Sequence, residues 1–455
     1  MKVSLVFPRT KYVSGDPPLG LANLAAYARS RMKGLDIEIL DSTFDRSLKD
    51  SMKRIKDLMP DVVGIFTDTM MYDDAVFASG VAKEAGSFVV MGGPHATVCP
   101  ESLERVCDIV VRGEGEVIFS EILERFAKSG PEGVRSLYDE QKMLDSAEKR
   151  ISNLDDLPLP AFDLLDMARY TSAWNYLDAF DIGLKGTTMI TSRGCPYRCS
   201  YCQPTLDLLF GPRLRRSSPE KVAGEIDDIA RKFSIEGIFF HDDTFTVDKI
   251  WTMEFCGSIK RKNTGLFWGC NSRLNTVDEE MLREMYSAGL RNIHFGIEAG
   301  SQRVIDEILD KRIRLTDASD ILNTARKIGI HTLGFFMIGA PGETRSEIKR
   351  TIDFARRLPL DEATFSITTP LPGTFLFDKA RITKSYNLSA NFSDFDYYKG
   401  GAVRRGDITA AGLKYLQIKA LIVFYLHPKR IKYLVRHLFS LSGIRKLVRK
   451  LRRFI

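Results

Sequence analysis

Three cysteines in one short run constrain this chain more than any other feature. Cys195, Cys199 and Cys202 are spaced C-x3-C-x2-C. A four-iron cluster needs one thiolate for each iron to be fully coordinated, so three cysteines leave one iron open, as in catalytic metal centres. The alternatives are a zinc site or buried thiols. Zinc sites usually have four ligands at fixed spacing, and no further Cys or His lies near Cys202 in the sequence.

The size and composition of the chain indicate a cytoplasmic protein. The 455 residues, 44% of them hydrophobic, fit two or three globular domains. Seven cysteines, three of them in the run, favour a reducing compartment over a disulfide framework. The first residues resemble a strand rather than a signal peptide, and no apolar run is long enough to span a membrane.

Residues 1–130 alternate short apolar strands with helical segments. Buried strands separated by helices predict an α/β fold, a doubly wound parallel sheet with helices on both faces. Ligands bind such sheets beyond the carboxyl ends of the strands. The expected strands are Val3–Phe7, Ile37–Leu40, Val62–Phe66, Phe88–Met91 and Ile109–Val111, and the first two helices are expected at Leu19–Arg31 and Leu48–Met59.

Residues 184–380 repeat the alternation of strands and helices. Six strand–helix units favour a partial (β/α)6 barrel, in which active sites lie at the carboxyl ends of the strands. Residues 131–183 are expected as a linker, and residues 381–455 as a C-terminal helical region. The expected strands of the barrel are Thr187–Thr191, Gly237–His241, Phe267–Asn271, Asn292–Gly296, Thr332–Ile338 and Thr364–Thr368.

The C-terminal tail is strongly basic. Residues 408–455 hold twelve Lys or Arg and no Asp or Glu, so the rest of the chain is net −5 although the whole is +7. Apolar residues recur there at helical spacing, and Pro428 divides the pattern into at least two helices. Basic amphipathic helices often lie on anionic membranes. The alternatives are a helical pair packed on the barrel, or RNA phosphate as the partner.

The cysteine run resembles the signature of the radical S-adenosylmethionine (SAM) enzymes. The phrases PPLGLANLAAY, GGPHATVCPE, VRGEGE and LDDLPLPAFDLLD resemble the cobalamin-binding domain and linker of one branch of that family. That branch is methyltransferase-type and is related to the anaerobic Mg-protoporphyrin cyclase and to hopanoid-modifying enzymes. The resemblance covers roughly residues 1–380, and it implies three cofactors: a 4Fe-4S cluster, SAM and cobalamin.

The resemblance also implies roles for individual residues. The cluster ligands would be Cys195, Cys199 and Cys202. The residues expected to bind SAM are Tyr201, Asp243, Arg273, Glu298 and Gly339. The residues expected to bind cobalamin are Thr67, Thr69, Gly92, Gly93, His95, Gly113 and Glu114. The D-x-H-x-x-G motif is absent, so no histidine from that motif would bind cobalt. His95 is either a loop residue near the corrin or a turn histidine with its hydrogen bonds satisfied.

Each expected SAM contact has a structural alternative. Tyr201 would lie beside the adenine or pack the loop. Asp243 would hold the amino group of SAM, with Asp242 serving the next loop. The alternative is that one of the two aspartates caps the helix that follows. The planar fork of Arg273 suits the SAM carboxylate or an ordinary salt bridge. Glu298 would accept the ribose hydroxyls, because an isolated buried carboxylate is costly.

Gly339 lies in a G-x-P-G-E element that would support the adenine through backbone contacts. Glu343, which ends that element, is expected to cap the following helix.

The function implied by the resemblance is methylation of an unactivated carbon in a hydrophobic, lipid-like substrate, after SAM is cleaved to a deoxyadenosyl radical. The alternatives are cyclisation, carbon–carbon coupling or hydration with the same cofactors, and RNA modification. A flavodoxin or ferredoxin would donate the electron. We expect peripheral contact with the inner face of the membrane through the tail, with nucleic acid the less favoured partner. No general acid or base is identified.

Overall fold

The protein is described by a computed structural model that covers residues 1–9, 14–45, 47–137, 143–177, 183–383, 387–389, 391–395, 403–404, 408–428 and 430–431. The chain divides into two compact units. The first comprises Met1–Ala173, Arg193–Pro196 and Gln203–Ser217, and the second Trp174–Ser192, Tyr197–Cys202 and Ser218–Ile455.

The first unit contains a parallel sheet in the order β2-β1-β3-β4-β5-β6. Its strands are β1 (Lys2–Phe7), β2 (Asp36–Asp41), β3 (Val62–Phe66), β4 (Phe88–Gly92), β5 (Ile109–Arg112) and β6 (Met143–Asp145). Its helices are α1 (Leu19–Arg31), α2 (Leu48–Leu58), α3 (Tyr72–Glu84), α4 (Pro94–Val98), α5 (Glu116–Arg135), α6 (Met167–Ala173) and α7 (Thr205–Phe210). The expected doubly wound sheet is confirmed.

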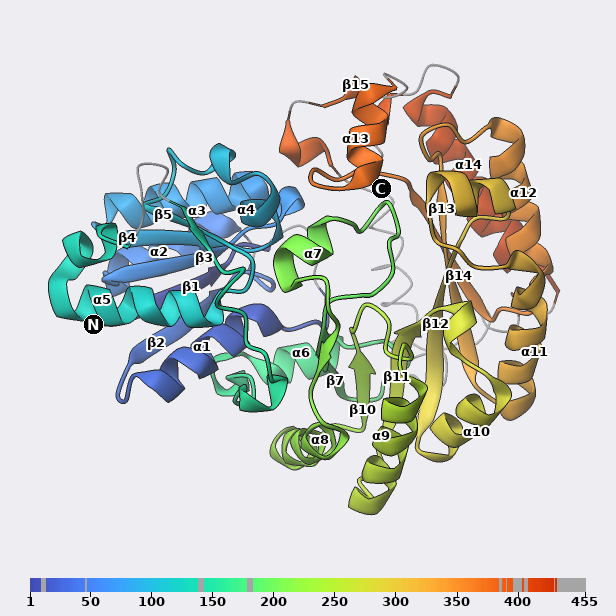
Figure 1. The fold of residues 1–455 in the computed structure, drawn as a ribbon, viewed down its shortest axis with the longest axis horizontal. Helices are drawn as coiled ribbons and strands as arrows, with labels where there is room; N and C mark the ends of the chain where they lie inside the picture. Colours follow the sequence, from blue (N-terminus) through green and yellow to red (C-terminus); the bar gives the residue numbers. More distant parts are fainter. Residues whose placement is uncertain are drawn as a thin grey trace. The chain divides into compact units, whose positions relative to one another are not determined.

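Apolar runs explain why this sheet is covered on both faces. Side chains of α2 and α3 pack with Val63, Ile65 and Val89 in one continuous core. Helices α1 and α5 contact each other over the opposite face (Figure 1). The strand order reverses between β1 and β3, and ligands of such sheets bind at that point, beyond the strand ends. Residues 131–173, expected as a linker, contribute β6 and α6 to this unit.

The second unit contains a second parallel sheet, in the order β14-β13-β12-β11-β10-β7. Its strands are β7 (Gly186–Met189), β10 (Gly237–Phe240), β11 (Phe267–Ser272), β12 (Leu290–Glu298), β13 (His331–Ile338) and β14 (Glu362–Ile367). Its helices are α8 (Pro219–Phe233), α9 (Lys249–Lys262), α10 (Glu279–Ser287), α11 (Ala318–Ile328), α12 (Arg345–Arg357), α13 (Phe375–Ile382) and α14 (Ala410–Tyr425). The expected six-strand partial barrel is confirmed (Figure 1).

Two small two-stranded sheets complete the fold. They join β8 (Ser192–Arg193) to β9 (Arg215–Arg216), and β15 (Asn387–Leu388) to β16 (Val403–Arg404).

Strand β13 shows that the two faces of the second sheet differ. Its even-numbered side chains are buried, whereas Leu333, Phe335 and Met337 are only half-buried. The buried Phe336 stacks on Phe365, with ring centroids 5.2 Å apart, whereas Phe335 meets His294 on the other face. Successive side chains of a strand point to opposite faces, so Leu333, Phe335 and Met337 share one partly accessible face of the sheet. Polar residues paired with them in register, among them His294, Thr364 and Ser366, lie on the same face.

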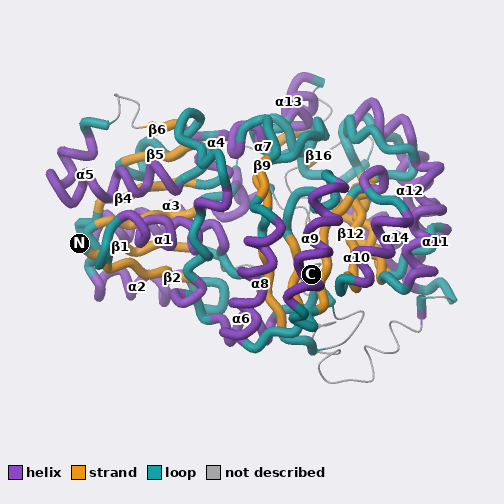
Figure 2. Tube along the Cα trace, turned by 60° about the horizontal axis from the view of Figure 1, so that its bottom comes forward, coloured by secondary structure: helices purple, strands orange, loops and turns teal. Residues whose placement is uncertain are grey.

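Helix α14 covers the free edge of this sheet. None of the described strands pairs with the outer edge of β14, so the main-chain groups on that edge need other partners. Gln417 Nε2 donates to the Phe365 carbonyl at 2.8 Å, and Tyr425 Oη donates to the Ala363 carbonyl at 3.1 Å. The helix also contacts α12, beside which it lies in Figure 2. The first part of the basic tail is therefore packed on the barrel.

The remainder of the tail, residues 432–455, lies outside the described residues, so the expected second helix beyond Pro428 stays a prediction. None of the described helices has the length and apolar character needed to cross a bilayer.

Removing the Tyr425 hydroxyl tests how much the contact between α14 and the edge of β14 stabilises the fold. Tyr425→Phe leaves the Ala363 carbonyl without its side-chain partner. We expect the free energy of unfolding to fall by about 1–3 kcal/mol, the cost of an unsatisfied buried acceptor. Tyr415→Phe is the matched control, because Tyr415 lies on the same helix and is 60% exposed. Urea denaturation of both variants measures the difference, and equal stabilities would contradict the proposed role.

Candidate functional site

The loops after β3 and β4 meet closely at the carboxyl edge of the first sheet. Gly93 has φ +111°, and a Cβ there would lie 2.7 Å from the Thr67 carbonyl oxygen, so glycine is required. Thr67 is fully buried, and its Oγ1 has no hydrogen-bond partner among the described residues. An unsatisfied buried hydroxyl is costly, and such groups in folded proteins point to a function or a missing ligand.

His95 is a structural residue of these loops. It is fully buried, with Nδ1 3.1 Å from Thr69 Oγ1 and Nε2 3.0 Å from Ser102 Oγ. Burial lowers the pKa of His95 to about 4, so the ring is neutral at physiological pH. Of the two expected roles, the structure fits the turn histidine with its hydrogen bonds satisfied, because both ring nitrogens are engaged by the protein.

Glu114 belongs to a buried ion-pair network. Arg193 Nη1 lies 2.9 Å from Glu114 Oε2, and Arg193 also pairs with Glu116. Arg215 pairs with the other oxygen of Glu114. Burial alone would raise the pKa of Glu116, but Arg193 outweighs it and the pKa is lowered. Arg193 precedes Gly194 and Cys195, so the network fixes the start of the cysteine loop to the loop after β5. The expected contact of Glu114 with cobalamin stays a prediction.

Gly113, the neighbour of Glu114, also requires glycine. It has φ +78°, and a Cβ there would clash with Ser146 Oγ after β6. Gly92, at the end of β4, has ordinary space around it, because its nearest neighbour would be the Val111 carbonyl oxygen at 3.6 Å.

In the second unit, the two aspartates after β10 have different roles. Asp242 is buried and accepts hydrogen bonds from the Thr191 amide at 3.1 Å, the Thr191 hydroxyl at 2.9 Å and the Ser192 hydroxyl. Helix α9 is capped by Asp248, whose side chain accepts from the Trp251 amide. The helix-cap alternative for Asp242 and Asp243 is therefore disfavoured.

The carboxylate of Asp243 has no hydrogen bond or ion pair with the described part of the chain. Its side chain is exposed. Even so, the surrounding protein desolvates it, and together with the repulsion of Asp242 this raises the pKa of Asp243 to about 6. An accessible carboxylate in a partly desolvated position, with no protein partner, is suited to bind a cationic group of a ligand.

Tyr201, Glu298 and Lys311 form a triad in which Glu298 and Lys311 are buried and Tyr201 is half-buried. Tyr201 Oη lies 3.2 Å from Glu298 Oε1, and Lys311 Nζ lies 3.0 Å from that oxygen and 2.9 Å from the Tyr201 oxygen. A Cβ at Gly296 would lie 2.6 Å from Glu298 Oε1, so glycine leaves room for the triad. Glu298 is therefore not the isolated buried carboxylate that we expected from the sequence, because Lys311 neutralises its charge.

Glu298 still has a free oxygen and a strained backbone. Its Oε2 makes no hydrogen bond to the described residues. Its φ of +70° is uncommon for a residue other than glycine, and such strain is concentrated at functional sites. Burial and the charge of Glu298 raise the pKa of Tyr201, so its phenol remains a donor.

Arg273, which follows β11, is directed at the cysteine loop. Its Nη1 lies 3.2 Å from Cys199 Sγ, and its guanidinium stacks over the Tyr197 ring at 3.7 Å from the centroid. Its Nη2 donates to the Lys311 carbonyl, and its Nε lies 3.3 Å from Asn275 Oδ1. The side chain is buried, with 4% of the residue exposed. The salt-bridge alternative is absent from the described residues, where Arg273 has no carboxylate partner.

The loop after β13 is built by two glutamates. Glu343 Oε2 accepts from the amides of Gly339 at 2.6 Å and Ala340 at 2.9 Å, which closes the turn. The expectation that Glu343 caps α12 was wrong, because Thr344 and Glu347 form the capping box. A Cβ at Gly339 would lie 2.7 Å from Leu413 Cδ2 of α14, so glycine is required here too.

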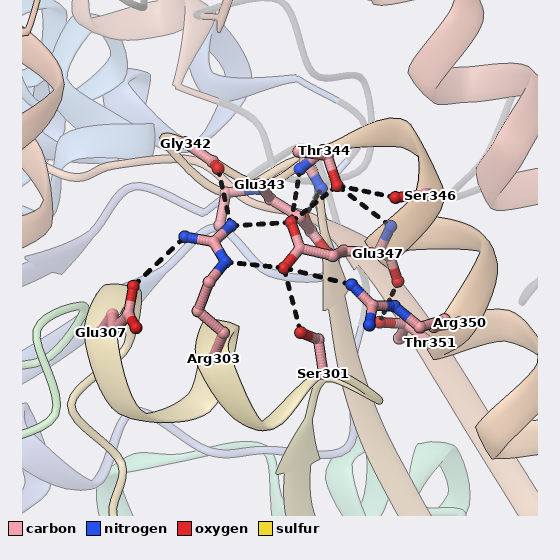
Figure 3. Close-up of polar contacts among 12 residues, drawn as sticks. Ser301, Arg303, Glu307, Gly342, Glu343, Thr344, Ser346, Glu347, Arg350 and Thr351 are labelled. Atoms are coloured by element: carbon pink, nitrogen blue, oxygen red, sulfur yellow. Dashed lines mark hydrogen bonds and ion pairs between the residues drawn. The ribbon is translucent and has the colours of Figure 1, made fainter.

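Glu347 also ties this loop to the one after β12. Figure 3 shows Arg303 and Ser301 converging on its carboxylate, with Arg303 Nη2 2.7 Å from Oε2. Hydrogen bonds from Arg303 hold the pKa of Glu347 far below its ordinary value, so the carboxylate stays ionised. The charge therefore fixes two of the loops at the carboxyl edge of the second sheet.

No three His, Cys, Asp or Glu side chains in the described part of the chain are grouped so that they could hold a single metal ion. A four-iron cluster binds each cysteine through a different iron, so its ligands are spaced more widely than those of one ion. The absence of a mononuclear site among the described residues therefore does not bear on Cys195, Cys199 and Cys202, which stay the predicted ligands of a cluster.

Comparisons with known proteins follow the same division of the chain. Residues 10–123 match the family described as the B12 binding domain, and residues 189–355 match the Radical SAM superfamily. An uncharacterized methyltransferase, PH0819 of Pyrococcus horikoshii, is 37% identical over 100% of this chain and 98% of its own length. Hopanoid C-3 methylase of Methylococcus capsulatus is 28% identical over 82% of this chain and 71% of its own.

The radical SAM methyltransferase TsrM of Kitasatospora setae, solved with cobalamin and a [4Fe-4S] cluster, has a similar fold. Its TM-score is 0.69 at 19% identity, over 86% of this chain and 80% of TsrM.

The chain belongs to the radical SAM superfamily and carries an N-terminal B12-binding domain, and the relative that matches its whole length is named as a methyltransferase. It is a radical SAM enzyme, and its cofactors are a 4Fe-4S cluster, SAM and cobalamin.

The residues present fit these groups. A buried guanidinium at Cys199 suits a thiolate that carries negative charge. The unpaired carboxylate of Asp243 suits an ammonium. The orphaned hydroxyl of Thr67 lies at the edge of the sheet where ligands of this fold bind.

Titration of Asp243 tests its assignment to the SAM amino group. We expect SAM affinity to fall as the pH drops through about 6, because the protonated carboxyl cannot pair with the ammonium. Asp243→Asn is expected to weaken binding at pH 8 and to abolish the dependence between pH 8 and 5.5. Asp248→Asn, which removes a charge from the cap of α9, is the control and should retain the pH profile. Isothermal titration of the reconstituted protein measures both, and an unchanged profile in Asp243→Asn would reject the assignment.

Proposed function

We propose that this enzyme methylates an unactivated carbon of a hydrophobic substrate. When bound, the cluster and SAM supply a hydrogen-abstracting radical and cobalamin supplies the methyl group. The observation that carries the proposal is the buried guanidinium of Arg273 against Cys199, in a chain that also has a B12-binding domain. Cys195, Cys199 and Cys202 would hold the cluster.

The residues around Cys202 would hold SAM. Asp243 would pair with its amino group, and Tyr201 would lie beside the adenine. Glu298 would accept a ribose hydroxyl through Oε2, while Lys311 keeps its other oxygen fixed. Gly339 would support the adenine through its main chain, in a turn that Glu343 closes. The chain's own residues thus bind and orient the ligand, and the cofactors supply the reactive groups.

The cobalamin site would lie at the carboxyl edge of the first sheet. The loop residues that we assign to it are Thr67, Thr69, Gly92, Gly93, His95, Gly113 and Glu114. His95 and Glu114 would act there indirectly, because their side chains are already bound by Thr69 and Ser102 and by Arg193 and Arg215. No histidine would ligate the cobalt.

Three apolar side chains on the accessible face of the second sheet support an apolar substrate. Leu333, Phe335 and Met337 of β13 are half-buried there, and Ile190, just beyond β7, is 50% exposed. Exposed apolar side chains cost free energy in water unless a ligand covers them. The hopanoid methylase relative acts on a substrate of this class.

The first test is to measure the cofactors bound after anaerobic reconstitution with iron, sulfide and hydroxocobalamin. We expect about four irons per chain, as a 4Fe-4S cluster requires, and about one corrinoid. Cys202→Ala should lose the cluster, whereas Cys256→Ala should retain it, because Cys256 is buried in α9. The product mass then separates the alternatives. A gain of one methyl group supports the proposal, whereas cyclisation, coupling or hydration would leave no added methyl. Iron without corrinoid would reject methyl transfer from cobalamin.

We also propose that the C-terminal region contacts an anionic membrane surface, where such a substrate would be found. On α14, Tyr415, Ile418 and Ile422 are 60%, 44% and 50% exposed, and Leu426 just beyond the helix is 62% exposed. Their spacing of three or four residues places them on one face. The residues that follow carry most of the tail's basic charge. An apolar stripe joined to basic residues is suited to anionic lipid.

Co-sedimentation with vesicles tests the membrane proposal. We expect binding to vesicles that contain phosphatidylglycerol but not to pure phosphatidylcholine, with loss at high salt because the attraction is screened. Ile422→Gln should weaken binding, whereas Ile250→Gln, at a 73% exposed position of α9, should not. Absence of sedimentation, or equal loss in both variants, would contradict the proposal, and an RNA band shift at the same salt would favour the nucleic-acid alternative.

A further inference from the structure

Arg273 is an unusual buried cation in this chain. Only 4% of the residue is exposed, yet none of the described carboxylates pairs with it. Arg193, whose side chain is 10% exposed, shows how such a charge is usually compensated, because it pairs with Glu114 and Glu116. A buried charge without an opposite charge is strongly destabilising. The arrangement therefore requires an anion near Arg273.

Among the described residues, Arg430 is also a buried arginine without a carboxylate in contact. Its charge is stabilised in a different way. Its guanidinium donates to several main-chain carbonyls, among them those of Leu360 and Arg356, and burial lowers its pKa to about 10. Arg273 has one main-chain carbonyl, one side-chain amide oxygen, an aromatic ring and a thiol. Of these four neighbours, only the Cys199 sulfur becomes anionic when it binds iron.

We propose that Arg273 donates an N–H···S hydrogen bond to the cluster ligand Cys199 and raises the reduction potential of the cluster. The inference rests on the proposed function, in that Cys199 must bind the cluster. Arg273 acts through Cys199 and is a positioning residue rather than a catalytic one. This assignment replaces the SAM carboxylate as the main partner of its guanidinium.

The direction of the effect follows from electrostatics. When the oxidised cluster takes one electron from a donor of the flavodoxin or ferredoxin class, the cluster and its thiolates gain one negative charge. A nearby positive charge and a hydrogen bond to sulfur stabilise that more negative state. The potential therefore rises, and a donor of moderate strength suffices to reduce the cluster.

The neighbours of Arg273 fix the orientation of its guanidinium group. The Tyr197 ring lies 3.7 Å below the guanidinium, and Asn275 Oδ1 and the Lys311 carbonyl hold Nε and Nη2. These contacts leave Nη1 directed at Cys199. A lysine at this position would keep the charge, but it has no planar group to stack on the ring and no fork to bond all three partners. Arginine is therefore the residue type that the site requires.

The test is a redox titration of the reconstituted cluster, followed by EPR in the absence of SAM. We expect the potential to be more negative in Arg273→Gln than in the wild type, and intermediate in Arg273→Lys. Arg198→Gln is the matched control, because Arg198 precedes Cys199 in the same loop but is exposed, so solvent screens its charge. Its potential should be close to that of the wild type. Iron content is measured for every protein, and SAM affinity is measured separately.

Each result decides the question. A more negative potential in the Gln variant, with the iron retained, supports the inference. If that variant loses its iron, Arg273→Lys carries the test, and a negative shift there supports the inference in the same way. Unchanged potentials would overturn it, and weaker SAM binding alongside them would return Arg273 to the SAM carboxylate. A wild-type protein that binds no iron would instead reject the proposed cluster itself, which is a separate outcome.

Discussion

Parallel strand pairing is the constraint on which the rest of this structure depends. Each pair of parallel strands needs a crossover connection, here usually a helix, before the chain can return in the same direction. The carboxyl ends of the strands are therefore gathered at one edge of each sheet. Residues far apart in the sequence, such as Thr191 and Asp242, become neighbours there. Almost every residue assigned to a cofactor follows directly after a strand, in the loops that this geometry brings together.

Ion pairs to buried carboxylates then fix those loops. Arg193 joins the start of the cysteine loop to Glu114 and Glu116, and Arg303 joins the loops after β12 and β13 through Glu347. Leaving a buried carboxylate without its cation is costly. These pairs therefore act mainly by permitting one arrangement of each loop. Arg273 is the exception, because its anionic partner is absent from the protein's own described carboxylates and is supplied by the cysteine that binds iron.

The strands were predicted more accurately than the polar contacts. The apolar runs placed β1, β3 and β10 within a residue or two of their observed bounds, because strand burial depends on local sequence. Strand β6 is three residues long and was not predicted. Lys311 was also not predicted. It lies thirteen residues after Glu298, in a loop without a motif, and nothing in the sequence pairs the two. Glu343 was expected to cap the following helix, but the folded chain uses Glu347 in the capping box and Glu343 to close the turn.

The sequence by itself determined the two parallel sheets, the cysteine spacing and the family. These follow from features within a few residues of one another: apolar periodicity, turn residues and motif spacing. Tertiary structure decided which polar group meets which. It assigned Asp242 to Thr191 and left the Asp243 carboxylate without a partner among the described residues. It also neutralised Glu298 with Lys311 and directed Arg273 to Cys199. The physical reason is that charge and hydrogen-bond partners are chosen by distance in space, which depends on the packing of the whole sheet rather than on the local chain.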